Sequence, residues 1–278
     1  MELAAVLFGV AAALSWGAGD FSGGIASKRN SVLTVVLVSQ CIGWAVLFGA
    51  TVVFSRSLPS LESLYASVLA GAIGMGSVVI LYRCLSRTKM GIVAPVTAIT
   101  SVVLPVAVGM IREGMPPGHK LLGFGFAVVA VLFLTAGERH EKVRAKDVVM
   151  PFLAGCGLGL FYIILDRIVE EDVLWPLVAI RLSSILLLAS LFLLQKRKIS
   201  LAAGSLTYVS LAGVLDIGGN LFFALGTKFG RLDITSVLSS LYPAATVFLA
   251  RLVLQERLSR MQWTGVSLTM VALTLVAL

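Results

Sequence analysis

Four charged side chains stand inside long apolar stretches of this sequence, and they are the first candidates for chemistry. Asp20, Arg181 and Asp216 lie well inside such stretches, and Arg83 lies less deeply. If the stretches cross a membrane, each ionisable residue at their centre costs about 2.5–3.5 kcal/mol to insert. Each of them therefore needs a partner, a ligand or a path for ions.

Asp216 and Asn220 are four residues apart, so a helix carries both on one face. Arg181, in the preceding apolar stretch, could form an ion pair with Asp216 and lower the cost of burying both. A permanent pair would make Asp216 a structural clamp, and Asp216→Asn would then leave a lone buried charge. A proton or a cationic ligand would instead make Asp216 part of a site, with proton coupling as one role. Both interpretations stay open.

Asp20 follows Trp16 by one helical turn and has glycines around it. An aromatic ring beside a carboxylate suits a cationic or zwitterionic ligand. The alternative is that Asp20 lies near the lipid headgroups and is hydrated. Tyr242 and Ser239, close to Pro243, could present hydroxyls to the same cavity. The predicted substrate-binding residues are Trp16, Asp20, Arg181, Asp216, Asn220, Ser239 and Tyr242.

Enzyme chemistry is disfavoured by what these stretches contain. The segment from Gly17 to Asp20 matches the GxGD pattern of intramembrane aspartyl proteases, but the companion motifs of that chemistry do not occur. The two histidines, His119 and His140, fall in predicted loops, so no Ser/His/Asp or metal-ligand set assembles at membrane depth. We therefore predict no catalytic residues, no cofactor and no metal.

Composition places the chain in a lipid bilayer. Hydrophobic residues make up 58% of its 278 residues and charged residues 13%, and the mean hydropathy is +1.00. Soluble domains carry roughly 25% charged residues. The net charge of +8 resides mostly in short loops, where basic residues meet headgroups, so no nucleic-acid partner is expected. We predict an integral, multi-pass protein of the cell (inner) membrane.

Ten apolar segments approach the roughly 20 residues that a spanning helix needs. The sequence thus predicts an all-α membrane protein with ten transmembrane helices, at 3–25, 32–54, 64–84, 92–111, 119–136, 149–167, 173–194, 204–226, 232–254 and 261–278.

The ten segments form two repeats of five. Shifting the chain by 142 residues aligns Gly71 with Gly213 and Gly123 with Gly265 without a gap. Because five is odd, the second copy must cross the membrane in the opposite sense, which makes the repeats inverted. We predict a first repeat over 1–136, a linker over 137–147 and a second repeat over 148–278.

Prolines interrupt the fourth segment of each repeat. Pro95 and Pro105 lie in the first copy and Pro243 in the second. A proline inside a helix frees the carbonyl four residues earlier, and freed carbonyls at membrane depth must face protein or a wet cavity. Interrupted helices in both halves therefore indicate a binding site between the repeats.

One segment also carries a family resemblance. Pro243, the run Glu256-Arg257-Leu258 and the run Gln262 to Gly265 make the chain similar to the drug/metabolite transporter superfamily, in particular its ten-helix EamA-type members. The first half carries a weaker version of the pattern around Gly91 to Thr97. The resemblance implies a carrier with a central cavity between inverted repeats.

The leading hypothesis is therefore a secondary transporter that moves a small metabolite or drug by alternating access. A channel or pore and a non-transporting membrane protein are the alternatives. The resemblance implies that both termini are cytoplasmic. However, the loops on the side of the termini contain six Lys or Arg residues and the opposite loops thirteen, so the positive-inside rule favours the reverse orientation.

Overall fold

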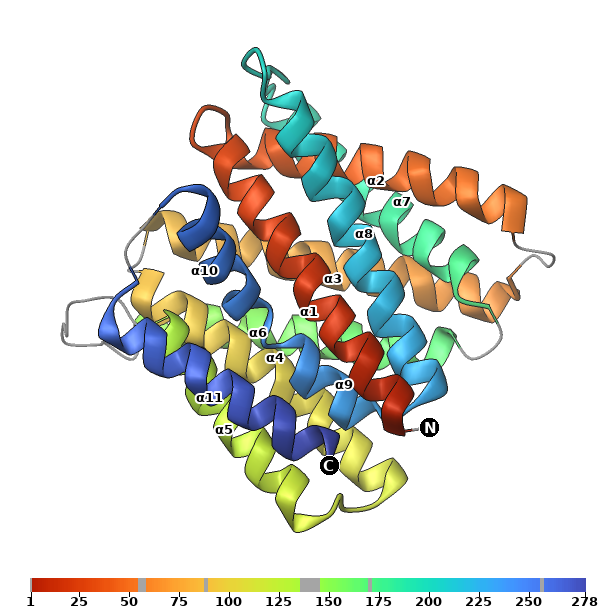
Figure 1. Cartoon of the computed structure of the whole chain (residues 1–278). Helices are drawn as coiled ribbons and strands as arrows, with labels where there is room; N and C mark the ends of the chain where they lie inside the picture. The colour runs from red at the N-terminus through yellow and green to blue at the C-terminus, as the bar shows by residue number, and fades with distance from the viewer. Residues whose placement is uncertain (1, 55–58, 88–89, 136–145, 170–171, 256–257) are drawn as a thin grey trace.

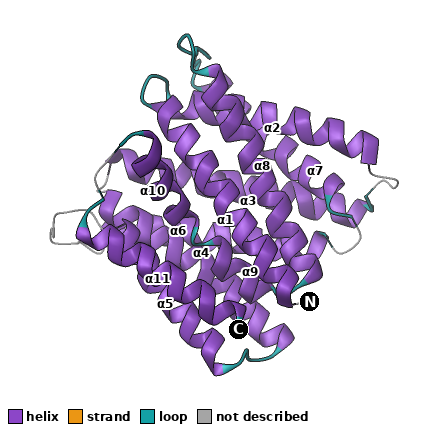
Figure 2. Ribbon diagram, in the orientation of Figure 1, coloured by secondary structure: helices purple, strands orange, loops and turns teal. Residues whose placement is uncertain are grey.

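The computed structural model describes residues 2–54, 59–87, 90–135, 146–169, 172–255 and 258–278. All regular structure in these ranges is helical, which confirms the predicted all-α class (Figure 2). Most of the predicted linker, residues 137–145, lies outside the described ranges. The helices are α1 (Glu2–Ser27), α2 (Val32–Phe54), α3 (Leu61–Arg87), α4 (Met90–Glu113), α5 (Gly118–Thr135), α6 (Lys146–Ile168), α7 (Leu174–Leu194), α8 (Leu206–Phe229), α9 (Leu232–Ser239), α10 (Tyr242–Val253) and α11 (Arg260–Ala277).

Eight segments of the described chain are long and apolar enough to cross a membrane, and α9 with α10 count together as one of them. The two remaining elements of the ten are α5, whose apolar part Gly118–Leu134 is shorter, and α11. These two helices pack against each other at one edge of the molecule (Figure 1).

The proline prediction is confirmed in one repeat and wrong in the other. The ninth segment breaks between α9 and α10, because Pro243 at the start of α10 has no N–H to continue the α9 ladder. In contrast, α4 runs unbroken from Met90 to Glu113 through Pro95 and Pro105. A transmembrane helix tolerates proline where its neighbours satisfy the freed backbone groups, so proline position alone overestimated the interruption.

The helices form two three-helix bundles with a third group beside them. Helices α1, α2 and α8 make the first bundle, and α3, α6 and α7 make the second. The third group, α4, α5, α9, α10 and α11, lies alongside both, with α4 against α6, and α9 and α10 against α1. Each of the two bundles draws helices from both repeats, so neither repeat packs as an independent unit.

Equivalent glycines of the two repeats make equivalent contacts. A methyl group added at Gly123 in α5 would meet the carbonyl oxygen of Ala272 and the side chain of Val276 in α11. The same addition at Gly265 in α11 would meet the carbonyl oxygen of Ala130 and the side chain of Leu134 in α5. Shifting either set by 142 residues gives the other. This packing is compatible with the predicted inverted repeat.

The molecule has two ends along its helix axes. Both chain termini lie at one end, where α2, α4, α6 and α8 also finish, and this end is called the terminal face (Figure 1). Helices α1, α3, α5, α7 and α10 finish at the other end, called the opposite face. The two faces differ in packing, and this difference shapes the site.

Candidate functional site

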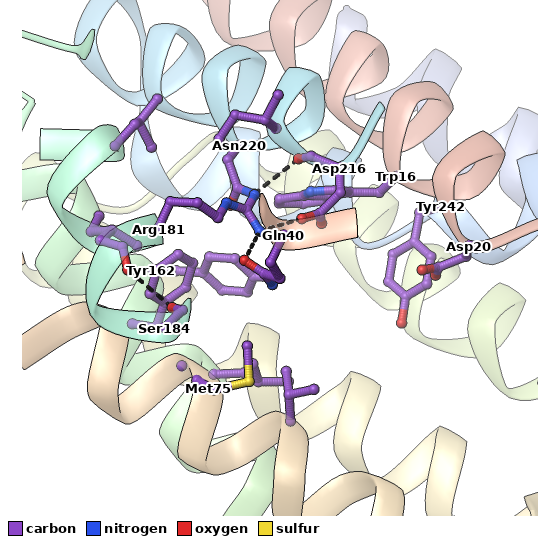
Figure 3. Close-up of a pocket in the computed structure, with 17 residues that line it drawn as sticks. Trp16, Asp20, Gln40, Met75, Tyr162, Arg181, Ser184, Asp216, Asn220 and Tyr242 are labelled. Carbon is purple, nitrogen blue, oxygen red and sulfur yellow. Dashed lines mark hydrogen bonds and ion pairs between the residues drawn. The ribbon is translucent and has the colours of Figure 1, made fainter. Parts of the chain in front are cut away.

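A polar chamber of about 190 Å³ lies between the two bundles, at the middle of their helices. The first bundle contributes side chains from α1, α2 and α8, and the second contributes side chains from α3, α6 and α7. Six of the seven residues predicted from the sequence line it together, namely Trp16, Asp20, Arg181, Asp216, Asn220 and Tyr242 (Figure 3).

Ser239 is the seventh predicted residue, and the structure does not bring it to the chamber. It is 2% exposed, and its hydroxyl donates a hydrogen bond of 3.1 Å to the carbonyl oxygen of Ser236. All eight residues of α9 are buried, so a hydroxyl there is enclosed by neighbouring helices. The helix break turns the chain so that Tyr242, three residues later, faces the chamber instead.

The predicted ion pair forms, and it joins the two bundles. Arg181 Nη1 lies 2.6 Å from Asp216 Oδ2 and also donates to Gln40 Oε1, so α7 of the second bundle is tied to α8 and α2 of the first (Figure 3). The Arg181 side chain is 7% exposed, whereas that of Asp216 is 43% exposed toward the chamber. Asn220 donates 2.9 Å to the backbone carbonyl of Asp216. The pair is therefore buried on one side and accessible on the other.

Sequence reasoning missed several residues that line the chamber. Gln40, Phe161, Tyr162 and Ser184 line it but are not among the predicted site residues. The repeat contains the signal for one of them, because a shift of 142 residues places Asp20 on Tyr162. If the repeats are inverted, as the sequence predicts, a chamber near the axis between them is lined by equivalent positions from both copies.

Aromatic rings form the floor of the chamber. The Tyr162 ring lies 4.8 Å from that of Phe223, 5.4 Å from Phe161 and 5.7 Å from Trp16, measured between ring centroids. The Trp16 indole packs on Gly219 in α8, where no side chain stands in the way. These rings come from α1, α6 and α8, so they close the chamber toward the terminal face across both bundles.

Beneath this floor, one continuous apolar cluster fills the space toward the terminal face. It includes buried Leu165, Val169, Leu177, Phe223 and Leu232, and it draws on seven helices, α1, α2, α3 and α6 to α9. Such a cluster excludes water, so the chamber is sealed on this side.

Polar contacts at the terminal face hold α4 against α9. Arg231 pairs with the fully buried Asp233 at 2.8 Å and donates to the backbone carbonyls of Glu113 and Gly114 at the end of α4. Gly109 permits this approach, because a methyl group there would lie 2.8 Å from the backbone nitrogen of Asp233. The contacts join the ends of two repeat-equivalent segments at the sealed side.

The opposite face is open instead. A vestibule of about 1280 Å³ shares Asp20, Asp216 and Tyr242 with the chamber and extends outward past Ser31 at the start of α2 and Gln195 at the end of α7. The apolar clusters near this face are separate. One joins α2, α3 and α7, and the other joins α1, α2 and α8. The vestibule passes between the bundles, and within the described part of the chain it gives the chamber a route toward the opposite face.

Gly17 sets the position of Tyr242 over the chamber. At this glycine α1 and α10 approach so closely that an added methyl group would lie 2.6 Å from the Tyr242 carbonyl oxygen and 2.6 Å from Ala245 Cβ. Thr246 strengthens the crossing by donating 3.0 Å to the Gly17 carbonyl oxygen. A larger residue at position 17 would displace α10 and Tyr242 with it.

Comparison with known proteins shows a similarity to a transporter family in the second half of the chain. Residues 146–278 match the model of the EamA-like transporter family. An uncharacterized protein of Methanocaldococcus jannaschii is 29% identical over 122 residues, which span 44% of this chain and 88% of that protein. A solved structure titled "Crystal structure of protein" has a TM-score of 0.80 at 18% identity and covers 99% of this chain and 98% of its own. At this identity it supports the fold alone.

The second half of the chain is therefore similar to the EamA-like transporter family, in agreement with the resemblance seen in the sequence. With eight segments of the described chain long and apolar enough to cross a membrane, the protein is an integral, multi-pass membrane protein.

Proposed function

We propose that this protein is a secondary carrier that moves a small molecule through the chamber by alternating access. The observation that carries the proposal is the one-sided chamber, which is open through the vestibule and sealed by a continuous apolar cluster toward the terminal face. A carrier alternates between such a state and a second state, in which the chamber is open toward the terminal face and closed toward the opposite face. Because the two bundles draw equivalent helices from both repeats, a rocking motion between them could generate the inverse state from the same contacts.

A channel or pore is the alternative function. A pore needs a continuous path, and the Leu165–Phe223 region blocks that path in this state. The polar residues of the chamber are also of different kinds on its two walls and do not repeat as a ring, and rings of side chains or carbonyls are the usual selectivity device of channels. Both features favour a carrier.

Counterflow in proteoliposomes tests the proposal. Vesicles preloaded with an excess of unlabelled compound should transiently accumulate the labelled form, and the rate should saturate with concentration. A panel of amino acids, nucleosides, sugars and cationic drugs, first screened by thermal shift on the purified protein, supplies the compounds. Labelled flux that only equilibrates and never saturates would show a channel and reject the carrier.

Cysteine labelling tests the position of the pathway. In a variant whose Cys41, Cys84 and Cys156 are replaced by alanine, Asp20→Cys and Tyr242→Cys should react with a water-soluble thiol reagent. The matched control is Ser239→Cys, which the packing around α9 should protect. Equal protection at all three positions would refute the chamber and vestibule as a water-filled pathway.

A further inference from the structure

The charged side chains of the chamber carry one more negative than positive charge, and, in the part of the chain that the structure describes, the carboxylate without a cationic partner is Asp20. Asp20, Arg181 and Asp216 are the charged side chains on the chamber wall among the described residues. Arg181 is engaged with Asp216 and Gln40, whereas Asp20 makes no hydrogen bond or ion pair within the described part of the chain. Asp20 is exposed and lines both the chamber and the vestibule, so its carboxylate is available to an occupant that carries a positive charge.

The same arrangement disfavours anions and zwitterions. A ligand carboxylate would need a free cation, but the guanidinium of Arg181 already serves two oxygen acceptors on α2 and α8. Arg83 and Arg197 line the vestibule and not the chamber. There, water and salt screen charges over a distance of about 8–10 Å. An anionic group inside the chamber would therefore face one net negative charge, that of Asp20.

The walls of the chamber are also unlike each other, and the repeat makes the difference plain. At four pairs of repeat-equivalent positions, the first bundle contributes the more polar residue and the second bundle the less polar one. The pairs are Trp16 with Leu158, Asp20 with Tyr162, Asp216 with Gly74, and Asn220 with Val78. A ligand that fits both walls has a charged end toward α1 and α8 and an apolar body toward α3 and α6.

The volume of the chamber and its aromatic side chains further define the class of ligand. A cavity of about 150 Å³ accommodates a benzene ring, so the chamber of about 190 Å³ has room for one ring or a branched chain with a small head group. Trp16 lines the acidic wall, and Tyr242 lies beside Asp20 in Figure 3. Aromatic faces attract cations as a carboxylate does, and they bind the carbon groups of an amine as well.

We propose that the chamber binds an organic monocation, an amine or ammonium group on a compact apolar body, with Asp20 as its counter-ion. This inference rests on the proposed function, since it names the class of molecule that the carrier would move. It assigns Asp20 the charge selection and leaves the Arg181–Asp216 pair as the bridge between the bundles.

Four probes of similar size and different charge test the proposal on the purified full-length protein. They are benzylamine, which is protonated at neutral pH, benzyl alcohol, benzoate and phenylalanine. Isothermal titration should show that benzylamine binds at least tenfold more tightly than each of the other three. Benzoate, phenylalanine or benzyl alcohol binding as tightly as benzylamine would overturn the proposal.

Two substitutions of Asp20 distinguish the effect of losing its charge on ligand binding from an effect on folding. Asp20→Asn should weaken benzylamine binding at least tenfold and leave benzyl alcohol binding within twofold, whereas Asp20→Glu should keep the preference for the cation. Glu62→Gln, in the first turn of α3 at the terminal face, is the control and should change neither. Retained benzylamine affinity in a folded Asp20→Asn protein would overturn the assignment. If Asp20→Asn does not fold, the order of the four probes on the wild type and on Asp20→Glu decides.

The outcomes also separate this inference from the carrier function. Saturable counterflow of an anion or a neutral compound, with no binding of benzylamine, would leave the carrier intact and reject the cation site. Binding of benzylamine without counterflow of any compound would support the site and reject the carrier. Uptake that depends on pH without any cation binding would show that Asp20 serves a proton alone, and the proposal would fail.

Discussion

Removing either partner of the Arg181–Asp216 pair should have an unequal cost, and the structure sets the order. Asp216→Asn leaves a guanidinium that is 7% exposed, with Gln40 as its remaining partner. Breaking a buried pair by removing one partner costs about 3–5 kcal/mol. Because Gln40 continues to accept one hydrogen bond, we expect the lower end of that range for the free energy of unfolding, about 3 kcal/mol.

The reverse substitution should be milder. Arg181→Gln leaves Asp216, whose side chain is 43% exposed and can be hydrated by chamber water. The loss should then approach that of an accessible ion pair, about 1 kcal/mol. In the double variant Arg181→Gln/Asp216→Asn no buried charge remains unpaired, so its loss should be close to that of Arg181→Gln alone. The two substitutions should therefore couple by about 3 kcal/mol.

Unfolding of the purified protein in detergent micelles, followed by its helical circular dichroism, measures these differences. Asp166→Asn is the control, because it leaves Arg112, its partner at 2.6 Å, whose side chain is 37% exposed. Its loss should stay within about 1 kcal/mol. Equal losses from the two single variants, or a double variant that equals their sum, would refute the view that chamber water reaches Asp216 but not Arg181.

Two glycine substitutions test the close helix crossings against matched open positions. Gly17→Ala should destabilise the protein by about 1–3 kcal/mol and weaken ligand binding, because the added methyl group meets the Tyr242 backbone. The matched control Gly24→Ala places its methyl group in open space and should be neutral or slightly stabilising. Gly265→Ala should destabilise the α5–α11 contact by a similar amount without changing ligand affinity, whereas Gly125→Ala should not destabilise it. Thermal unfolding in detergent and titration with benzylamine give both readouts, and equal stability of each pair would contradict the crossings.

The sequence predicted most of the helical framework because the apolar segments are long and the bilayer length is fixed. It also predicted the Arg181–Asp216 contact, since two opposite charges in consecutive apolar segments have few other ways to lower their cost. The broken ninth segment followed from Pro243. These predictions depend on the length, charge and proline content of individual segments, which can be read directly from the sequence.

The errors arose where the outcome depends on neighbouring helices. Ser239 and Tyr242 look alike as polar residues near a proline, but the turn between α9 and α10 buries one and exposes the other to the chamber. The prolines of α4 resemble Pro243 in sequence, yet that helix continues through both. Tyr162 was missed because a tyrosine in an apolar segment costs little and so attracts no attention. Its equivalence to Asp20 would have identified it.

The open vestibule gives the unequal distribution of basic residues a functional meaning. Helix ends around its mouth adjoin the loops that contain thirteen Lys or Arg residues, while the sealed terminal face adjoins the loops that contain six. The positive-inside rule predicts a mouth that faces the cytoplasm, whereas the family resemblance predicts the reverse orientation. The state described here would load or release its ligand on the cytoplasmic side. A cysteine at Ser31, at the mouth, should react with an impermeant thiol reagent in inverted membrane vesicles and not in intact cells, and the opposite pattern would place the termini in the cytoplasm.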